Sequence, residues 1–173
     1  MKCDPEGGIL LLCYGNPARL DDGLGPAFGE AIEKIAPPGV NVETDYQLTL
    51  EDVKTAADHK VVIFVDASVS GDSPFFLRPV RPQAALSFSS HSLEPEHVLA
   101  LAEQLFGRKP EAYALGIRGY EFSDFGEQLS PDAQANLESA LQFMSTLLER
   151  GDVAQASAAL ACSVGSRTAG NGD

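Results

Sequence analysis

An unbroken apolar run, GILLLCY at residues 8–14, constrains the fold more than any other stretch of the chain. A continuous apolar run that ends at a glycine is typical of a strand buried on both faces of a parallel sheet. Gly15 ends this run, and apolar residues then recur at helical spacing from Leu24 to Ile35, before Pro37. The order of strand, glycine loop and helix predicts a layered α/β fold.

The rest of the chain continues this alternation. KVVIFVD at residues 60–66 is the strongest strand signal, because it is rich in β-branched residues. Further strands are expected at 40–48, 84–88 and 112–117, and helices at 51–58, 95–107 and 131–151. Residues 68–82 are expected to form a loop or an irregular hairpin, and 119–130 a connection rich in glycine and acids. We therefore predict a three-layer α/β fold, in which a twisted, mostly parallel sheet of about five strands has helices on both faces.

The length of 173 residues fits one ordinary domain. We expect residues 1–151 to form this single domain. Residues 152–173 are mostly small and polar and have no sustained apolar period, so we expect a flexible C-terminal tail there.

Charge and cysteine content limit the partners and the compartment. The net charge of −13 argues against a nucleic-acid partner, because such binding depends on lysine and arginine displacing counterions. The three cysteines lack metal-type spacing and are expected to be free thiols in a reducing compartment. The run at 8–14 is too short to span a membrane, and acids precede it where a signal peptide carries positive charge. We expect a cytoplasmic protein with no membrane partner.

Polar side chains follow three of the expected strands, at the ends where parallel sheets place functional loops. Asp22 follows the run at 8–14, Asp66 ends the run at 60–66, and His91 follows the strand expected at 84–88. Two carboxylates and an imidazole from separate strands suit a borderline divalent cation such as nickel or zinc. The spacing alone does not name the metal.

Each of these residues also has a purely structural explanation. Asp22 would satisfy N–H groups at the start of a helix, and Asp66 would cap the turn after its strand. His91 would be a packed or surface histidine. Asn16 is expected to make a side-chain turn hydrogen bond or to contact substrate backbone, and Asp21 to shape the loop.

Other common chemistries fit the sequence poorly. A glycine loop between a strand and a helix can hold a phosphate, but Asp21 and Asp22 would place negative charge where the anion should bind. No GxSxG or HExxH motif is present, and Cys13 lies in a strand expected to be buried, where a thiolate is disfavoured. A nucleotide-binding α/β domain is kept as an alternative, which a thermal shift with nucleotides would test.

Three segments occur in a recognisable order: GNPARLDDGLG, then VIFVDAS, then SSHSLEPEHVLALAEQL. They resemble the hydrogenase maturation endopeptidases, which trim the C-terminus of the nickel-iron hydrogenase large subunit. The first segment resembles the opening signature GNxxxxDDGxG of this family, the second its second acidic segment and the third its histidine segment. YQLTLEDV and LGIRGYEFSDFGEQLSP extend the likeness, which covers about residues 8–150.

The resemblance implies a role for each matching residue. Asp22, Asp66 and His91 match the catalytic groups of the family that contact nickel. The nickel belongs to the substrate, because the family cleaves a large-subunit precursor only after nickel has been inserted. Two departures are Leu50, where related sequences often carry proline, and the additional C-terminal tail.

Further residues are candidates for contact with the substrate. They are Asn16, Asp21 and Asp45, which lie near the expected strand ends. The general base is left open among Asp21, Asp22 and Asp45, because nothing in the sequence chooses between them.

The leading hypothesis is a peptidase that removes the C-terminal extension of a nickel-loaded hydrogenase large-subunit precursor. It would act as a monomer, with nickel supplied by the substrate and no permanent organic cofactor. The competing hypothesis is a non-hydrolytic nickel-sensing chaperone, or precursor-binding module, that uses the same three ligands without cutting.

Overall fold

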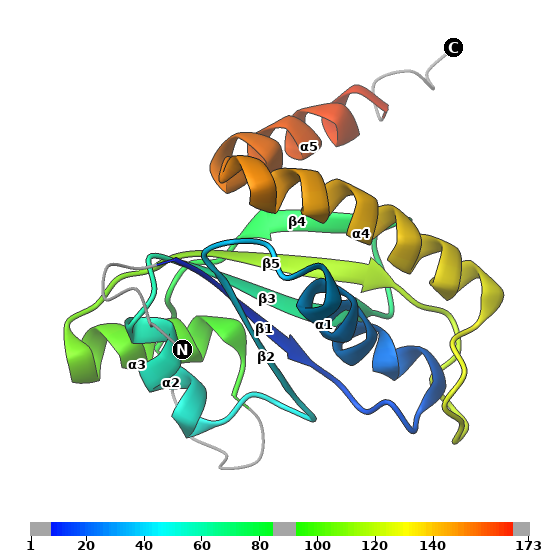
Figure 1. The fold of residues 1–173 in the computed structure, drawn as a ribbon, viewed down its shortest axis with the longest axis horizontal. Coiled ribbons are helices and arrows are strands. Elements are labelled where there is room, and N and C mark those ends of the chain that lie inside the picture. The colour runs from blue at the N-terminus through cyan, green and yellow to red at the C-terminus, as the bar shows by residue number, and fades with distance from the viewer. Residues whose placement is uncertain (1–7, 85–92, 168–173) are drawn as a thin grey trace.

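The computed structural model describes residues 8–84 and 93–167, and these contain a five-stranded sheet with helices on both faces (Figure 1). The strands are β1 (Ile9–Tyr14), β2 (Val40–Asp45), β3 (Val61–Ser68), β4 (Phe75–Pro79) and β5 (Glu111–Arg118). Their order is β2-β1-β3-β5-β4; all neighbours are parallel except the pair of β4 and β5. The predicted fold class is confirmed.

The helices form the outer two layers. They are the 3-10 helix η1 (Leu20–Gly23) and the α-helices α1 (Leu24–Ile35), α2 (Leu50–Ala57), α3 (Pro95–Phe106), α4 (Pro131–Arg150) and α5 (Val153–Arg167). Helices α1 and α4 cover one face of the sheet, and α2 and α3 cover the other (Figure 1).

The apolar run that opens the chain is buried on both faces, as the sequence predicts. Leu11 and Cys13 point into the cluster shared with α1 and α4, while Leu10 and Leu12 point into the cluster shared with α2 and α3. Two cores of this kind hold the sheet rigidly between the helix layers, because each strand residue is packed on one side or the other.

Two elements differ from the sequence-based expectation. Strand β4 lies within 68–82, where a loop or an irregular hairpin was expected, and it pairs antiparallel at the edge of the sheet, a position where Pro79 is tolerated. The strand expected at 84–88 lies outside the described residues, except for residue 84.

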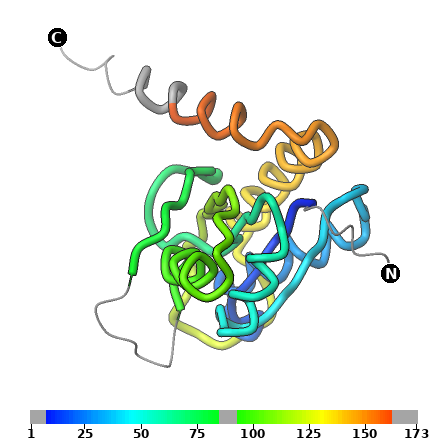
Figure 2. Tube along the Cα trace, turned by 90° about the vertical axis from the view of Figure 1, so that its left-hand side faces the viewer, coloured from blue at the N-terminus to red at the C-terminus, as the bar shows by residue number. Residues whose placement is uncertain are grey.

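The second difference is helix α5, in the segment expected to be a flexible tail. Its buried and half-buried residues are Val153, Ala156, Ser157 and Leu160, which recur at helical spacing. The Ser157 hydroxyl donates a hydrogen bond of 3.3 Å to the backbone oxygen of Leu77 in β4. In Figure 2, the coloured part of α5 continues from the end of α4 along the top of the molecule. Because this stripe consists mainly of small residues, the sequence shows no clear apolar period.

Candidate functional site

The candidate site lies at the C-terminal ends of the central parallel strands β1 and β3. Strand β1 has β2 on one side and β3 on the other, and the chain reaches them in turn through α1 and α2. The direction of chain order therefore reverses between β1 and β3, which is where open α/β sheets bind their ligands. The loop after β1 carries Asp22, and Asp66 lies two residues before the end of β3.

A tight loop after β1 fixes the position of Asp22. Gly15 has a φ of 142°, and a Cβ at this residue would lie 2.1 Å from the backbone oxygen of Asp22, so only glycine fits. The backbone N–H of Asn16 donates to Asp22 Oδ2 at 3.0 Å, while Asn16 Oδ1 accepts a hydrogen bond of 2.9 Å from the N–H of Ala18. Asn16 thus makes the side-chain turn that was one of its two expected roles, and orients Asp22 through its backbone.

Asp21 is fully buried, although Asp22 beside it is partly exposed. Its carboxylate accepts hydrogen bonds from the N–H groups of Tyr120, Glu121 and Ser130 and from the Ser130 hydroxyl, at 2.7 to 2.9 Å. Burial by itself would raise the pKa of Asp21, but these hydrogen bonds outweigh it and hold the pKa below its ordinary value. Asp21 therefore shapes the loop and has no exposed surface with which to contact substrate or activate water.

The surroundings of Asp66 shift the pKa of its carboxyl group strongly. Burial raises its pKa to about 7, and the negative charges of Asp22 and Glu94 add to this, while a hydrogen bond from the N–H of Ala67 opposes it. Asp22, Asp66 and Glu94 therefore share one local field. The charges of Asp22 and Glu94 thus make the ionised form of Asp66 less favourable.

Aromatic side chains create the low-polarity surroundings of Asp66. Asp66 is in register with Gly116 on β5. The Phe76 ring occupies the space where a side chain at Gly116 would lie, because a Cβ added to Gly116 would be only 2.2 Å from this ring. Burial also raises the pKa of Tyr14; the carboxylates of Asp66 and Glu94 are among the charges that add to this effect. Tyr14 thus lies near the same carboxylates.

Sequence reasoning missed Tyr14 and Glu94 as neighbours of the site. Tyr14 was expected only as part of a buried strand. Glu94 is the N-cap of α3, where its side chain and that of His97 form a capping box. The spacing of Glu94 and His97 is a signal for a helix start, but no local pattern shows that this start faces Asp66.

The remaining candidate residues are less well placed by the structure. His91 lies outside the described residues. Asp45 is exposed at the end of β2, in register with Tyr14, and its backbone oxygen accepts a hydrogen bond of 3.2 Å from the N–H of Gly15. Within residues 8–84 and 93–167, no three His, Cys, Asp or Glu side chains form a group able to hold a metal ion.

Comparison with known proteins identifies the family. No family model matches the chain. The chain is 31% identical over 157 residues to the hydrogenase expression/formation protein HoxM of Azotobacter vinelandii. The aligned region covers 86% of this chain and 76% of HoxM. The fold is similar to that of the hydrogenase maturating endopeptidase HybD from E. coli, with a TM-score of 0.65 and 25% identity over 83% of this chain and 94% of HybD. The chain belongs to the hydrogenase maturation endopeptidase family.

A second solved structure of the family, the maturation protease HycI from Thermococcus kodakarensis, supports the fold. Its TM-score is 0.64 at 20% identity, over 84% of this chain and 95% of HycI. Membership of the family gives the chain a role in hydrogenase maturation. Among the helices that the structure describes, none is long and apolar enough to cross a membrane.

Proposed function

We propose that this protein is an endopeptidase that cleaves the C-terminal extension of a nickel-loaded hydrogenase large-subunit precursor. The observation that carries the proposal is the electrostatic coupling of Asp22 and Asp66, from two different strand ends, at the switch point of the sheet. The third group is His91, which is only three residues before Glu94 in the sequence, and Glu94 acts on Asp66.

The nickel in this proposal belongs to the substrate. Two carboxylates and an imidazole complete the coordination of a nickel ion that the precursor presents, so coordination serves as recognition of a loaded precursor. The same contact holds the adjacent peptide bond beside the site, where positioning lowers the barrier to hydrolysis. Because a ligating carboxylate must be deprotonated, Asp66 gives up the proton that it holds near neutral pH. Asp22 and Asp45 are the remaining candidates for the general base.

The experiment is a cleavage assay with purified precursor, in nickel-loaded and nickel-free forms, read by intact mass. We expect a discrete loss of C-terminal mass only from the loaded form. Asp22→Asn, Asp66→Asn and His91→Ala should each be folded by circular dichroism and reduce the cleavage rate by at least about 100-fold, the scale of losing a residue that contacts the reacting groups.

Two outcomes would contradict the proposal. Equal cleavage of nickel-free precursor would show that nickel does not gate the reaction. A stable complex with loaded precursor, without any loss of mass, would instead support a non-hydrolytic nickel-sensing chaperone.

The proposed setting is the cytoplasm, with the protein acting as a monomer; the buried free thiol of Cys13 is consistent with a reducing compartment.

A further inference from the structure

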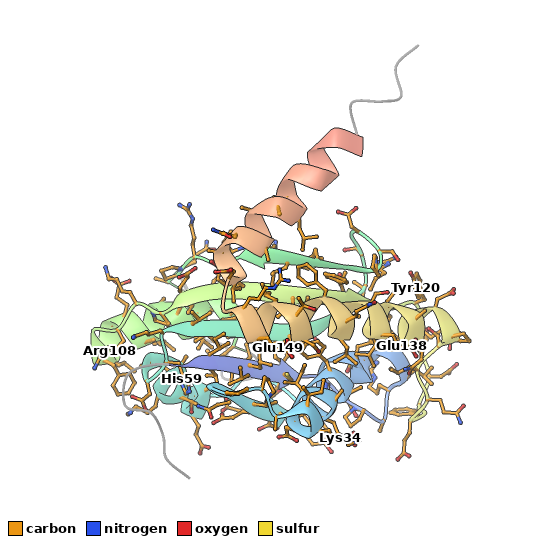
Figure 3. All side chains as sticks on the ribbon, turned by 45° about the horizontal axis from the view of Figure 1, so that its top comes forward. Lys34, His59, Arg108, Tyr120, Glu138 and Glu149 are labelled. Atoms are coloured by element: carbon orange, nitrogen blue, oxygen red, sulfur yellow. The ribbon has the colours of Figure 1, made fainter. Side chains whose placement is uncertain are left out.

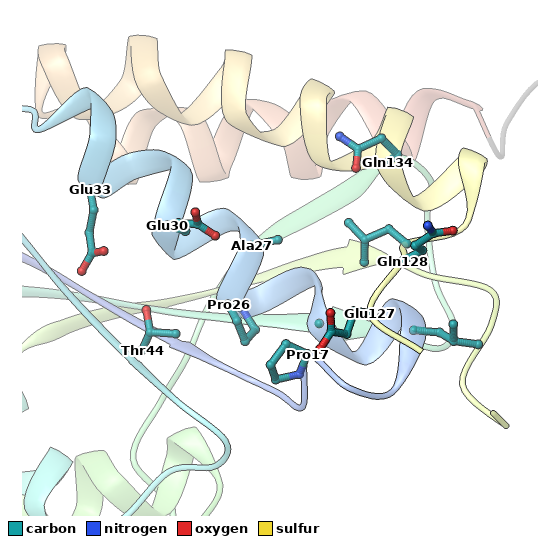
Figure 4. Close-up of a pocket in the computed structure, with 12 residues that line it drawn as sticks. Pro17, Pro26, Ala27, Glu30, Glu33, Thr44, Glu127, Gln128 and Gln134 are labelled. Carbon is teal, nitrogen blue, oxygen red and sulfur yellow. The ribbon is translucent and has the colours of Figure 1, made fainter. Parts of the chain in front are cut away.

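A groove runs beside the loop that carries Asp22, on the side of α1 and α4 (Figure 4). Its volume is about 690 Å³, and its walls come from the loop after β1, from α1, from β2 and from the connection that leads into α4. Pro17, Leu20 and Gly23 of the loop line it, so it is continuous with the segment that positions Asp22. An occupant of the groove would therefore lie directly behind the candidate site.

The groove combines an apolar surface with acidic side chains. Its apolar part includes Pro26, Ala27 and Leu129, and its three charged residues are the glutamates Glu30, Glu33 and Glu127. No lysine or arginine is among the lining residues. The groove thus complements a segment that carries positive charge beside apolar side chains.

Two of these carboxylates have no ion-pair partner among the described residues. Glu30 pairs with Lys34 at 2.8 Å, but both side chains are more than two-thirds exposed, so this pair is screened by water. Neither Glu33 nor Glu127 forms an ion pair within the part of the chain that the structure describes. The negative charge of the groove is therefore available to a partner.

An exposed aromatic residue adjoins the groove in sequence. Phe125 is 86% exposed and lies two residues before Glu127, in the connection between β5 and α4. This connection is bonded to the Asp22 loop by the N–H of Leu20, which donates to the backbone oxygen of Gly126 at 2.8 Å. A large aromatic side chain left in water, two residues from a residue of the groove wall, is a typical anchor for a protein partner.

We propose that the groove lined by Glu33 and Glu127 is a docking site for a segment of the hydrogenase precursor that carries lysine or arginine beside apolar residues. The identity of the partner rests on the proposed function. The role of the groove is to hold this segment behind the Asp22 loop, away from the cleaved bond, so it contributes affinity rather than chemistry.

The test measures binding of the full-length protein to purified large-subunit precursor by biolayer interferometry, at low and high salt. We expect Glu33→Gln with Glu127→Gln to weaken Kd about tenfold at low salt and much less at high salt, because salt screens exposed charges. Glu103→Gln with Glu149→Gln removes the same charge from α3 and α4 outside the groove and should leave Kd within about twofold of wild type. Phe125→Ser should weaken Kd at both salt concentrations.

A Kd unchanged by the Glu33 and Glu127 substitutions at low salt would overturn the docking site, as would an equal loss in the control variant. Cleavage is followed by mass in the same samples, so that the two proposals fail separately. Wild type that binds through the groove without cutting would refute the peptidase and support the docking site. Wild type that cuts while the double variant binds normally would refute only the docking site.

Discussion

Asp21 and Asp22 are neighbours of the same chemical type with opposite surroundings. Four hydrogen bonds fix the buried carboxylate of Asp21, whereas Asp22 is partly exposed and accepts one from the N–H of Asn16. The donors that surround Asp21, three backbone N–H groups and the Ser130 hydroxyl, hold it inside and leave Asp22 toward the site. A sequence of two acids therefore separates into one that holds the loop and one that serves the site.

Asp66→Asn should stabilise the protein at neutral and higher pH while reducing its activity. The pKa of Asp66 is about 7 in the folded state and near 3.8 in an unfolded chain. Well below pH 3.8 the group is neutral in both states and does not affect the free energy of unfolding. As the pH rises from 4 to 7, the unfolded chain loses the proton first, so wild-type stability falls relative to a side chain that never ionises.

The measurement is urea unfolding at pH 4 and pH 8, with chelator present. At about 1.4 kcal/mol per pKa unit, we expect Asp66→Asn to be roughly 2 to 4 kcal/mol more stable than wild type at pH 8 and nearly equal at pH 4. Asparagine keeps an acceptor for the N–H of Ala67, so that hydrogen bond is retained. A variant less stable than wild type at pH 8 would refute the buried, repelled state of Asp66.

At the scale of elements, the loop after β1 and the connection between β5 and α4 behave as one unit. Besides the carboxylate of Asp21, backbone hydrogen bonds join Leu20 with Gly126 and Asp21 with Glu121. Ser130, which donates two hydrogen bonds to the Asp21 carboxylate, is also the N-cap of α4, where its hydroxyl oxygen accepts from the N–H of Ala133 at 3.3 Å. The start of α4 and the position of Asp22 are thus set by the same carboxylate.

Asp21→Asn should loosen this unit. The amide NH₂ replaces one acceptor oxygen and faces an N–H donor, which leaves buried donors unsatisfied and costs about 2 to 4 kcal/mol of unfolding free energy. The exposed Asp45→Asn is the matched control and should change stability by less than about 0.5 kcal/mol. Urea unfolding gives both values, and an Asp21→Asn midpoint equal to that of wild type would contradict the structural role of this carboxylate.

The sequence predicts those elements whose local pattern and tertiary role agree. Strand β1 and residues 61–65 of β3 are apolar because they are packed between the two helix layers, and Pro131 and Gly151 mark the two ends of α4. The bounds of β4 were not predicted within the loop or irregular hairpin expected at 68–82, because its pairing with β5 is decided by residues distant in the sequence. The coupling of Glu94 to Asp66 is of the same kind, since it depends on how α3 meets the sheet.

For the molecule as a whole, the length of the strands separates the end that carries the candidate site from the opposite end. Tyr120 lies at the end that carries the candidate site, and His59 and Arg108 lie at the opposite end (Figure 3). Helix α5 sits beside β4, at the sheet edge farthest from β2. Stability contributed there is therefore separable from the chemistry near β1 and β3.

Removal of residues 152–173 tests this separation. Val153 and Ser157 are buried, and Ala156 and Leu160 pack against the core cluster of α1 and α4, so the deletion exposes apolar surface on β4 and α4. Burial of one such aliphatic side chain is worth about 1.5 to 3 kcal/mol, and we expect a loss of stability of at least this size, seen as a lower Tm in calorimetry. Removal of residues 168–173 alone is the control and should leave Tm unchanged.

At a temperature where the shortened protein is folded, its rate of precursor cleavage should stay within about twofold of wild type, because changes at distant sites act independently. An unaltered Tm would show that α5 does not support the core, and a folded but inactive protein would show that it acts on the site.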